Sequence, residues 1–277
     1  MDRSRTPSGA LLVVFNALYW PYLVVTCVLF FVPAFFIFLV TFWQKPRRAL
    51  HAYTSLWASH YLAWAPYAGI RVEGRERAPK GRACVYVANH QSLVDILAVY
   101  GLRLPFLWVS KIENFRVPFL GWNMYLNGYV PLRRGHLPSI RRMLRVCERA
   151  LRSGSSLCVF PEGTRSKDGA LKPFYRGAFW LAVRAGVPIV PIVVSGTGEI
   201  LPKGQLGIRP RPVTVRVLDP ISPDEAAGDD RRLRELVFER MQRELAVLRG
   251  QSLVAEPALA TIPLEARVPN VGDGSAE

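Results

Sequence analysis

The sequence predicts an α/β fold, a central mixed sheet flanked by helices, preceded by N-terminal membrane-embedded or interfacial helices. Between residues 71 and 250, short apolar runs alternate with longer amphipathic ones, the pattern of strands joined by helices. Residues 11–44 contain no charged residue and no histidine, which is long enough to cross a bilayer. We therefore divide the chain into membrane-anchoring helices (1–70), an α/β domain (71–250) and a loose tail (251–277).

Two prolines, Pro21 and Pro33, divide the N-terminal apolar run. Two arrangements fit it: one kinked span over residues 22–42, or a hairpin that dips into one leaflet. Lys45, Arg47 and Arg48 follow the run, against two arginines before it. By the positive-inside rule this small excess places the following domain on the cytoplasmic side of the inner membrane.

A second uncharged stretch, residues 49–70, contains two histidines and four residues at helical spacing, Trp57, Tyr61, Trp64 and Ala68. An aromatic stripe of this kind is typical of a helix at the headgroup level of a bilayer. It is equally typical of a helix buried in a protein core. The pattern alone leaves both interpretations open.

The α/β region has six strand-like runs, rich in β-branched and aromatic residues. They cover residues 84–88, 106–110, 129–132, 157–160, 189–195 and 213–218. Helices are expected over 93–101, 138–152, 178–185 and 229–248. Gly186 is placed to end the third of these helices. In the last helix, Leu233, Leu236, Val237 and Met241 form the apolar stripe that should face the core.

The charge balance points to an anionic partner. The formal net charge of the 277 residues is +15, which fits either nucleic acid or an anionic membrane surface. The long apolar run favours the membrane, and the sequence has no nucleic-acid recognition motif. The four cysteines form no C-x-x-C pair and no metal-ligand spacing, so we expect no metal site.

The first chemical motif is Asn-His-Gln-Ser-Leu-Val-Asp at residues 89–95, directly after an expected strand. If the helix begins at Ser92, Asp95 falls in its first turn and can point back to His90. An imidazole steered by a carboxylate is suited to proton abstraction near neutral pH. Alternatively, Ser92 caps the helix and Asp95 completes a capping box, with no chemistry involved.

The second motif is Phe-Pro-Glu-Gly-Thr-Arg-Ser at residues 160–166, which also ends a strand. Ligands of open α/β sheets bind at the carboxyl edge of the strands, and Arg165 at that edge can grip a phosphate in bidentate fashion. An exposed turn with a Glu–Arg pair is the alternative. Two polar motifs at strand ends favour a shared site.

Cations follow two further strands. Lys111 comes after the run at 106–110, and Arg133 and Arg134 come after the run at 129–132. They fit either a phosphate-binding edge or a solvated basic loop.

Together these motifs resemble the glycerolipid acyltransferase family, in particular bacterial 1-acylglycerol-3-phosphate acyltransferases. The family's N-H-x-S-x-x-D block matches residues 89–95, and its F-P-E-G-T-R-S block matches residues 160–166. A V-P-I-x-P-V-like block matches residues 187–192. The resemblance covers roughly residues 70–220, and the order of the blocks adds to its specificity.

The resemblance implies roles for these residues. His90 would be the general base and Asp95 its orienting acid, with direct attack of the acceptor hydroxyl on an acyl thioester. Glu162, Gly163, Thr164 and Arg165 match positions that bind the glycerol phosphate, and Lys111 looks like the family's phosphate-contacting lysine. The implied acceptor is lysophosphatidate, the product phosphatidate, and the co-substrate acyl-CoA or acyl carrier protein. The family uses no metal or prosthetic group, and often begins with a helix pair in one leaflet.

One block departs from the family pattern. An Asp-Arg pair usually follows the corresponding strand, and here Arg133 and Arg134 stand there. Arg134 aligns best with the family arginine, although a one-residue shift selects Arg133. The missing acid leaves room for another acceptor, such as a different lysolipid or glycerol 3-phosphate. A non-catalytic protein that binds anionic lipid is the remaining alternative, but it leaves both motifs unexplained.

Overall fold

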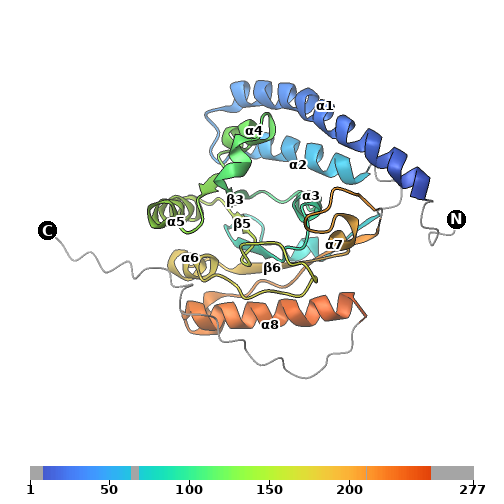
Figure 1. Ribbon diagram of the computed structural model, residues 1–277. Coiled ribbons are helices and arrows are strands. Elements are labelled where there is room, and N and C mark those ends of the chain that lie inside the picture. The colour runs from blue at the N-terminus through green and yellow to red at the C-terminus, as the bar shows by residue number, and fades with distance from the viewer. Residues whose placement is uncertain (1–8, 64–68, 210, 251–277) are drawn as a thin grey trace.

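The computed structural model describes residues 9–63, 69–209 and 211–250, and within them lies a seven-stranded sheet (Figure 1). The strand order is β1-β7-β6-β2-β5-β3-β4, with β6 and β7 antiparallel and the other neighbours parallel. The strands are β1 (Ile70–Glu73), β2 (Val85–Ala88), β3 (Leu107–Lys111), β4 (Val130–Leu132), β5 (Leu157–Val159), β6 (Ile189–Ser195) and β7 (Val213–Val217). The predicted mixed sheet is confirmed.

The helices are α1 (Gly9–Thr41), α2 (Arg48–Ala63), α3 (Val94–Tyr100), α4 (Leu120–Asn127), α5 (Leu137–Arg152), α6 (Gly177–Ala185), α7 (Thr197–Ile200) and α8 (Asp230–Leu248). Short 3-10 turns span Arg75–Arg77, Ile112–Arg116 and Pro223–Ala226. Each strand and helix expected between residues 71 and 250 is present within one or two residues. Gly186 ends α6 in a left-handed conformation, as predicted.

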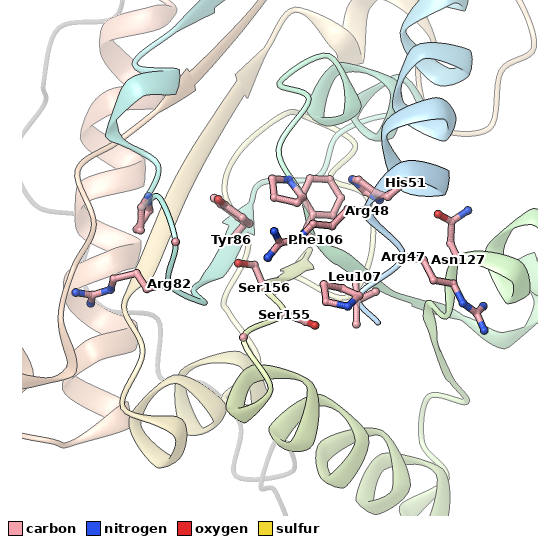
Figure 2. A pocket seen from close by; sticks show the side chains of 15 residues that line it. Arg47, Arg48, His51, Arg82, Tyr86, Phe106, Leu107, Asn127, Ser155 and Ser156 are labelled. Carbon is pink, nitrogen blue, oxygen red and sulfur yellow. The ribbon is translucent and has the colours of Figure 1, made fainter. Parts of the chain in front are cut away.

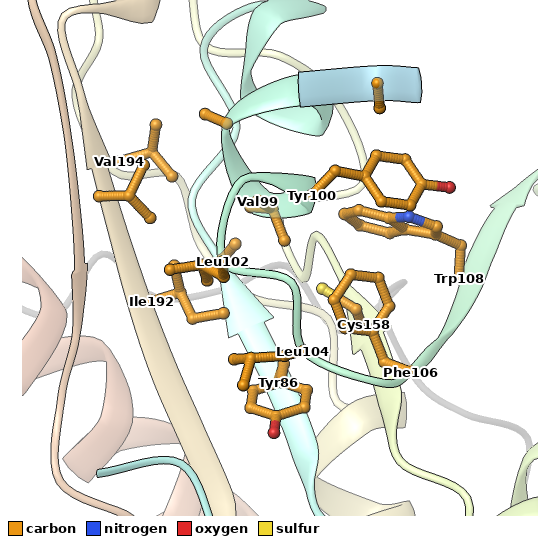
Figure 3. Close-up of a cluster of buried hydrophobic side chains, with 14 of the residues drawn as sticks. Tyr86, Val99, Tyr100, Leu102, Leu104, Phe106, Trp108, Cys158, Ile192 and Val194 are labelled. Carbon is orange, nitrogen blue, oxygen red and sulfur yellow. The ribbon is translucent and has the colours of Figure 1, made fainter. Parts of the chain in front are cut away.

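Two apolar cores cover the two faces of the sheet. On one face, side chains of the sheet pack against α2 and α3, and the aromatic rings of Tyr86, Tyr100, Phe106 and Trp108 gather there (Figure 3). The other core joins the sheet to α5, α6 and α8. In α8, Leu233, Val237 and Met241 are fully buried and Leu236 is partly buried against the same core, which confirms the predicted stripe. Burial of both faces explains why β2 and β6 are apolar up to Ser195, the last residue of β6.

The N-terminal apolar run differs from the predicted span over residues 22–42. It forms one continuous helix that begins at Gly9 and includes both Pro21 and Pro33. Each proline removes one backbone hydrogen bond, which the helix tolerates here. The helix lies along the domain: Asn16 Oδ1 accepts from the Ile208 N–H at 2.7 Å, and the Phe31 ring meets the Trp122 ring of α4.

The second uncharged stretch is a buried helix followed by a strand. In α2, Trp57 and Tyr61 are buried against α1 and share a hydrogen bond of 2.8 Å, so the core-helix interpretation holds for them. Trp64 and Ala68 lie outside the described residues, as does the tail at 251–277. Ile70, taken with the helical stretch in the sequence, instead begins edge strand β1, which pairs with β7.

Candidate active site

The two sequence motifs lie at the same edge of the sheet. The first follows β2 and the second follows β5, and these strands are parallel neighbours. The side chain of Asn89 fixes this end of β2 to β6, because its amide donates to the Val194 carbonyl at 2.9 Å and its Oδ1 accepts from the Val194 N–H at 2.7 Å. The His90 loop is therefore held between two strands at the carboxyl edge, where α/β sheets bind ligands.

His90 and Asp95 form a hydrogen-bonded pair. The His90 Nδ1 lies 2.8 Å from Asp95 Oδ2, with the imidazole 12% exposed and the carboxylate fully buried. A carboxylate on Nδ1 selects the tautomer in which Nε2 is the basic nitrogen. This geometry is that of a general base with an orienting acid.

Asp95 accepts further hydrogen bonds that fix its position. Its Oδ2 accepts from the backbone N–H groups of Gln91 (2.6 Å) and Ser92 (2.8 Å), while the Thr197 hydroxyl donates to Oδ1. The capping alternative therefore holds in part, since Asp95 does bind the backbone before α3. Because the same carboxylate oxygen also reaches His90, capping and orientation are two results of one arrangement.

The second motif holds the His90 backbone from both sides. The Glu162 Oε1 accepts from the His90 N–H at 2.7 Å, and the Ser166 N–H donates to the His90 carbonyl at 2.7 Å. The Phe160 ring stacks on the imidazole with centroids 4.1 Å apart and an interplanar angle of 14°. The turn at 160–166 thus positions the histidine that the first motif supplies.

Glu162 is buried beneath the site, with only 4% of its surface exposed. Its second oxygen accepts from the Lys172 N–H at 3.1 Å. Burial raises the pKa of the carboxyl from 4.5 to about 7, partly offset by the hydrogen bonds from the His90 and Lys172 backbone. The structure places Glu162 against backbone groups, where it supports the loop around His90.

Gly163 occupies a position that no other residue fits well. Its φ is +65°, and a Cβ there would lie 2.5 Å from the Tyr175 ring. Thr164 and Arg165 follow at the surface of the turn. The turn at Gly163 brings Thr164 and Arg165 to the same edge of the sheet as His90.

Two lysines that sequence reasoning missed converge on this turn. Lys203 Nζ donates to the Thr164 hydroxyl (3.2 Å) and to the Arg165 carbonyl (3.0 Å). Lys172 Nζ donates to the same carbonyl at 3.2 Å. Desolvation, and after it the nearby cations Lys172 and Arg165, lowers the pKa of Lys203. Such a gathering of positive charge is suited to a phosphate group.

The other predicted cations lie farther along the same edge. Lys111 ends β3 and pairs in register with Leu132 of β4, so Arg133 and Arg134 follow immediately beside it. All three side chains are exposed, and Lys111 forms an ion pair with Glu113 at 3.3 Å. The structure brings them to the carboxyl edge, two and three strands from His90.

The opposite, amino-terminal edge of the sheet has a hollow of its own. Its lining includes Arg82, Tyr86, Phe106 and Ser156, which stand before or near the starts of β2, β3 and β5, together with Arg48 of α2 and Asn127 of α4 (Figure 2). A volume of about 70 Å³ holds about two water molecules. It lies at the other end of the strands from His90 and is too small for a lipid.

The N-terminal helix α1 is long and apolar. Among the described residues, one helix is long and apolar enough to cross a membrane, Ala10–Thr41, and little of it is buried. Its exposed side chains include Val24, Val25, Leu29, Val32, Phe36 and Val40. An exposed apolar surface of this extent marks a contact with lipid or protein.

The chain is similar to known acyltransferases. Residues 69–195 match the family model described as Acyltransferase. The chain is 40% identical over 192 residues to a 1-acyl-sn-glycerol-3-phosphate acyltransferase of Chlamydomonas reinhardtii, which covers 68% of this chain and 57% of the relative. It is 42% identical over 172 residues to a chloroplastic enzyme of that name from Arabidopsis thaliana, covering 62% and 48%. The chain thus spans about half the length of these curated relatives.

A solved structure covers more of the chain. The crystal structure of a 1-acyl-sn-glycerophosphate acyltransferase from Thermotoga maritima superposes with a TM-score of 0.72 at 28% identity, over 86% of this chain and 97% of that one. The matched family region contains both motifs, the His90–Asp95 pair and the turn that holds it. The chain belongs to the glycerolipid acyltransferase family.

Proposed function

We propose that the chain is a 1-acylglycerol-3-phosphate O-acyltransferase, which moves a fatty acyl group from acyl-CoA or acyl carrier protein to the sn-2 hydroxyl of lysophosphatidate. The observation that supports it most is the His90–Asp95 pair held by the Glu162 turn beside a group of cations. The relatives' names supply the acceptor, and the cations at the Arg165 turn suit its phosphate.

The proposed chemistry needs no acyl-enzyme, metal or prosthetic group. His90 Nε2 takes the proton of the acceptor hydroxyl as its oxygen attacks the thioester carbonyl carbon. The tetrahedral intermediate collapses when the carbon–sulfur bond breaks, and the imidazolium returns its proton to the departing thiolate. Asp95 stabilises the imidazolium between these two steps.

The proposed location is the inner membrane, with the domain on the cytoplasmic side. The exposed apolar side of α1 would contact lipid while the helix lies along the domain, so that acceptor and product stay in the bilayer near the sheet edge. Binding to anionic liposomes tests this: replacing exposed Val25 and Leu29 by glutamate should weaken it, and unchanged binding would count against the proposal.

Thiol release from acyl-CoA in the presence of lysophosphatidate tests the activity. We expect His90→Ala to lower the rate by about 10²–10⁴-fold, and His136→Asn, which keeps the exposed cap of α5, to leave it unchanged. Full turnover by His90→Ala would refute the role. Other lysolipids and glycerol 3-phosphate belong in the same assay, because Arg133 stands where the family has an acid.

A further inference from the structure

One flank of the molecule carries a dense row of arginines. Seven exposed arginines, which we call the α5 arginine face, lie on α5 and the turn before it: Arg133, Arg134, Arg141, Arg142, Arg145, Arg149 and Arg152. Between residues 133 and 152 the single acid is Glu148, which pairs with Arg152 at 3.1 Å and with Arg184 at 3.0 Å. Like charges one turn apart destabilise a helix, and packing does not require them, because α5 is held by buried Leu144, Cys147 and Leu151.

This face does not point toward the proposed lipid surface. The buried side of α5 belongs to the core with α6 and α8, whereas α1 and α2 contribute to the core on the other face of the sheet (Figure 1). A bilayer that covers the exposed side of α1 would therefore leave the outer side of α5 in water. A soluble anionic partner fits this position better than lipid headgroups.

The arginine face also begins at the active edge. Arg133 and Arg134 follow β4 beside Lys111, at the carboxyl ends of the parallel strands, and α5 then runs toward the opposite edge. A partner seated along α5 would lie at the border of the edge that holds His90. A flexible thioester arm attached to that partner would reach the imidazole from the side away from the membrane.

The length of the face favours a protein over a nucleotide. From Arg141 to Arg152 the helix rises about 16 Å, whereas the phosphates of one nucleotide span a shorter distance. Guanidinium groups along such a length are complementary to a row of carboxylates on a helix. We propose that the α5 arginine face docks a small acidic acyl carrier protein, which delivers the acyl thioester. This inference rests on the proposed function, which itself leaves the donor open.

Steady-state turnover with two donors tests the docking on the full-length protein in lipid nanodiscs. The variant is Arg141→Glu with Arg145→Glu, and the matched control is Arg231→Glu with Arg232→Glu on α8, which makes the same change in charge. We expect kcat/KM for acyl carrier protein to fall by about tenfold or more in the first variant, with kcat/KM for acyl-CoA unchanged. The control should change neither value.

A binding measurement keeps the docking separate from catalysis. Anisotropy of labelled acyl carrier protein should report binding that weakens with salt and is lost in the α5 variant. Equal loss of turnover with both donors would overturn the proposal, as would carrier binding that the variant retains. Wild-type turnover with acyl-CoA and no carrier binding would also overturn it while leaving the proposed function intact. Carrier binding without transfer to any acceptor would support the docking and refute the function.

Discussion

Replacing Glu162 by glutamine changes a buried carboxyl that holds the His90 loop. The side chain is 4% exposed and accepts from the His90 N–H at 2.7 Å and the Lys172 N–H at 3.1 Å. Glutamine keeps the shape and one acceptor, but its NH₂ group cannot accept the second hydrogen bond. The variant therefore removes both a hydrogen bond and a titrating group.

The effect of the Glu162 carboxyl on the pH dependence of stability has a definite sign. The pKa of Glu162 rises from 4.5 to about 7 on folding, so between these values the folded protein holds a proton that the unfolded chain has lost. Wild-type stability should fall with rising pH in this window, by about 3 kcal/mol in all. The lost hydrogen bond should cost the variant about 1–3 kcal/mol at every pH.

The free energy of urea unfolding, measured for both proteins from pH 4.5 to pH 8 in one detergent, tests this reasoning. At pH 4.5 the wild type should be the more stable protein. The difference in the free energy of unfolding between the two proteins should shrink, or reverse in sign, as the pH approaches 8. The reason is that the wild-type carboxylate becomes charged while buried, whereas glutamine carries no charge. A difference that stays constant or grows with pH would refute the account. Other titrating groups cancel in the difference.

Three further predictions follow from the site and the core. Thr197→Val removes the hydroxyl that donates to Asp95. It should lower kcat by about tenfold or more without raising the KM for the acceptor, whereas Thr197→Ser should keep the wild-type kcat. An unchanged kcat in Thr197→Val would contradict this positioning role. Lys203→Gln should raise the KM for lysophosphatidate by about tenfold but not for an acceptor without phosphate, with Lys80→Gln as the exposed control. Phe179→Ala, at a fully buried site in α6, should lower the free energy of unfolding by about 3–5 kcal/mol; a loss below 1 kcal/mol by urea titration would show that the core refills the space.

The sequence predicted that the two motifs meet at one edge of the sheet, because the signals for this are local. His90 and Glu162 each stand directly after a short apolar run, and parallel strands bring such positions to one edge. Thr197, which binds Asp95 across 102 residues of chain, was not among the predicted site residues. The same reasoning applied to the run at 189–195 would have found it, since Thr197 follows the end of β6.

Other features depend on packing that a single sequence does not specify. The periodicity of Trp57 and Tyr61 shows that one side of α2 is apolar, but not whether lipid or α1 covers it. Lys172 and Lys203 lie in loops, and their convergence on the Arg165 carbonyl results from the paths of two separate segments. Strand β1 has the sequence Ile-Arg-Val-Glu, and its two charged residues keep it from forming an apolar run like those that predicted the other strands.

The two motifs of this family act here as one structural unit. Both backbone polar groups of His90 bind the second motif, the N–H to Glu162 and the carbonyl to the Ser166 N–H, and Phe160 covers the imidazole. Asp95 alone could choose the tautomer of the ring, but not the position of the peptide that carries it. A chain with the first motif and a different turn after β5 would retain a histidine–aspartate pair on an unsupported loop. The resemblance is therefore specific because the observed placement of His90 depends on both motifs.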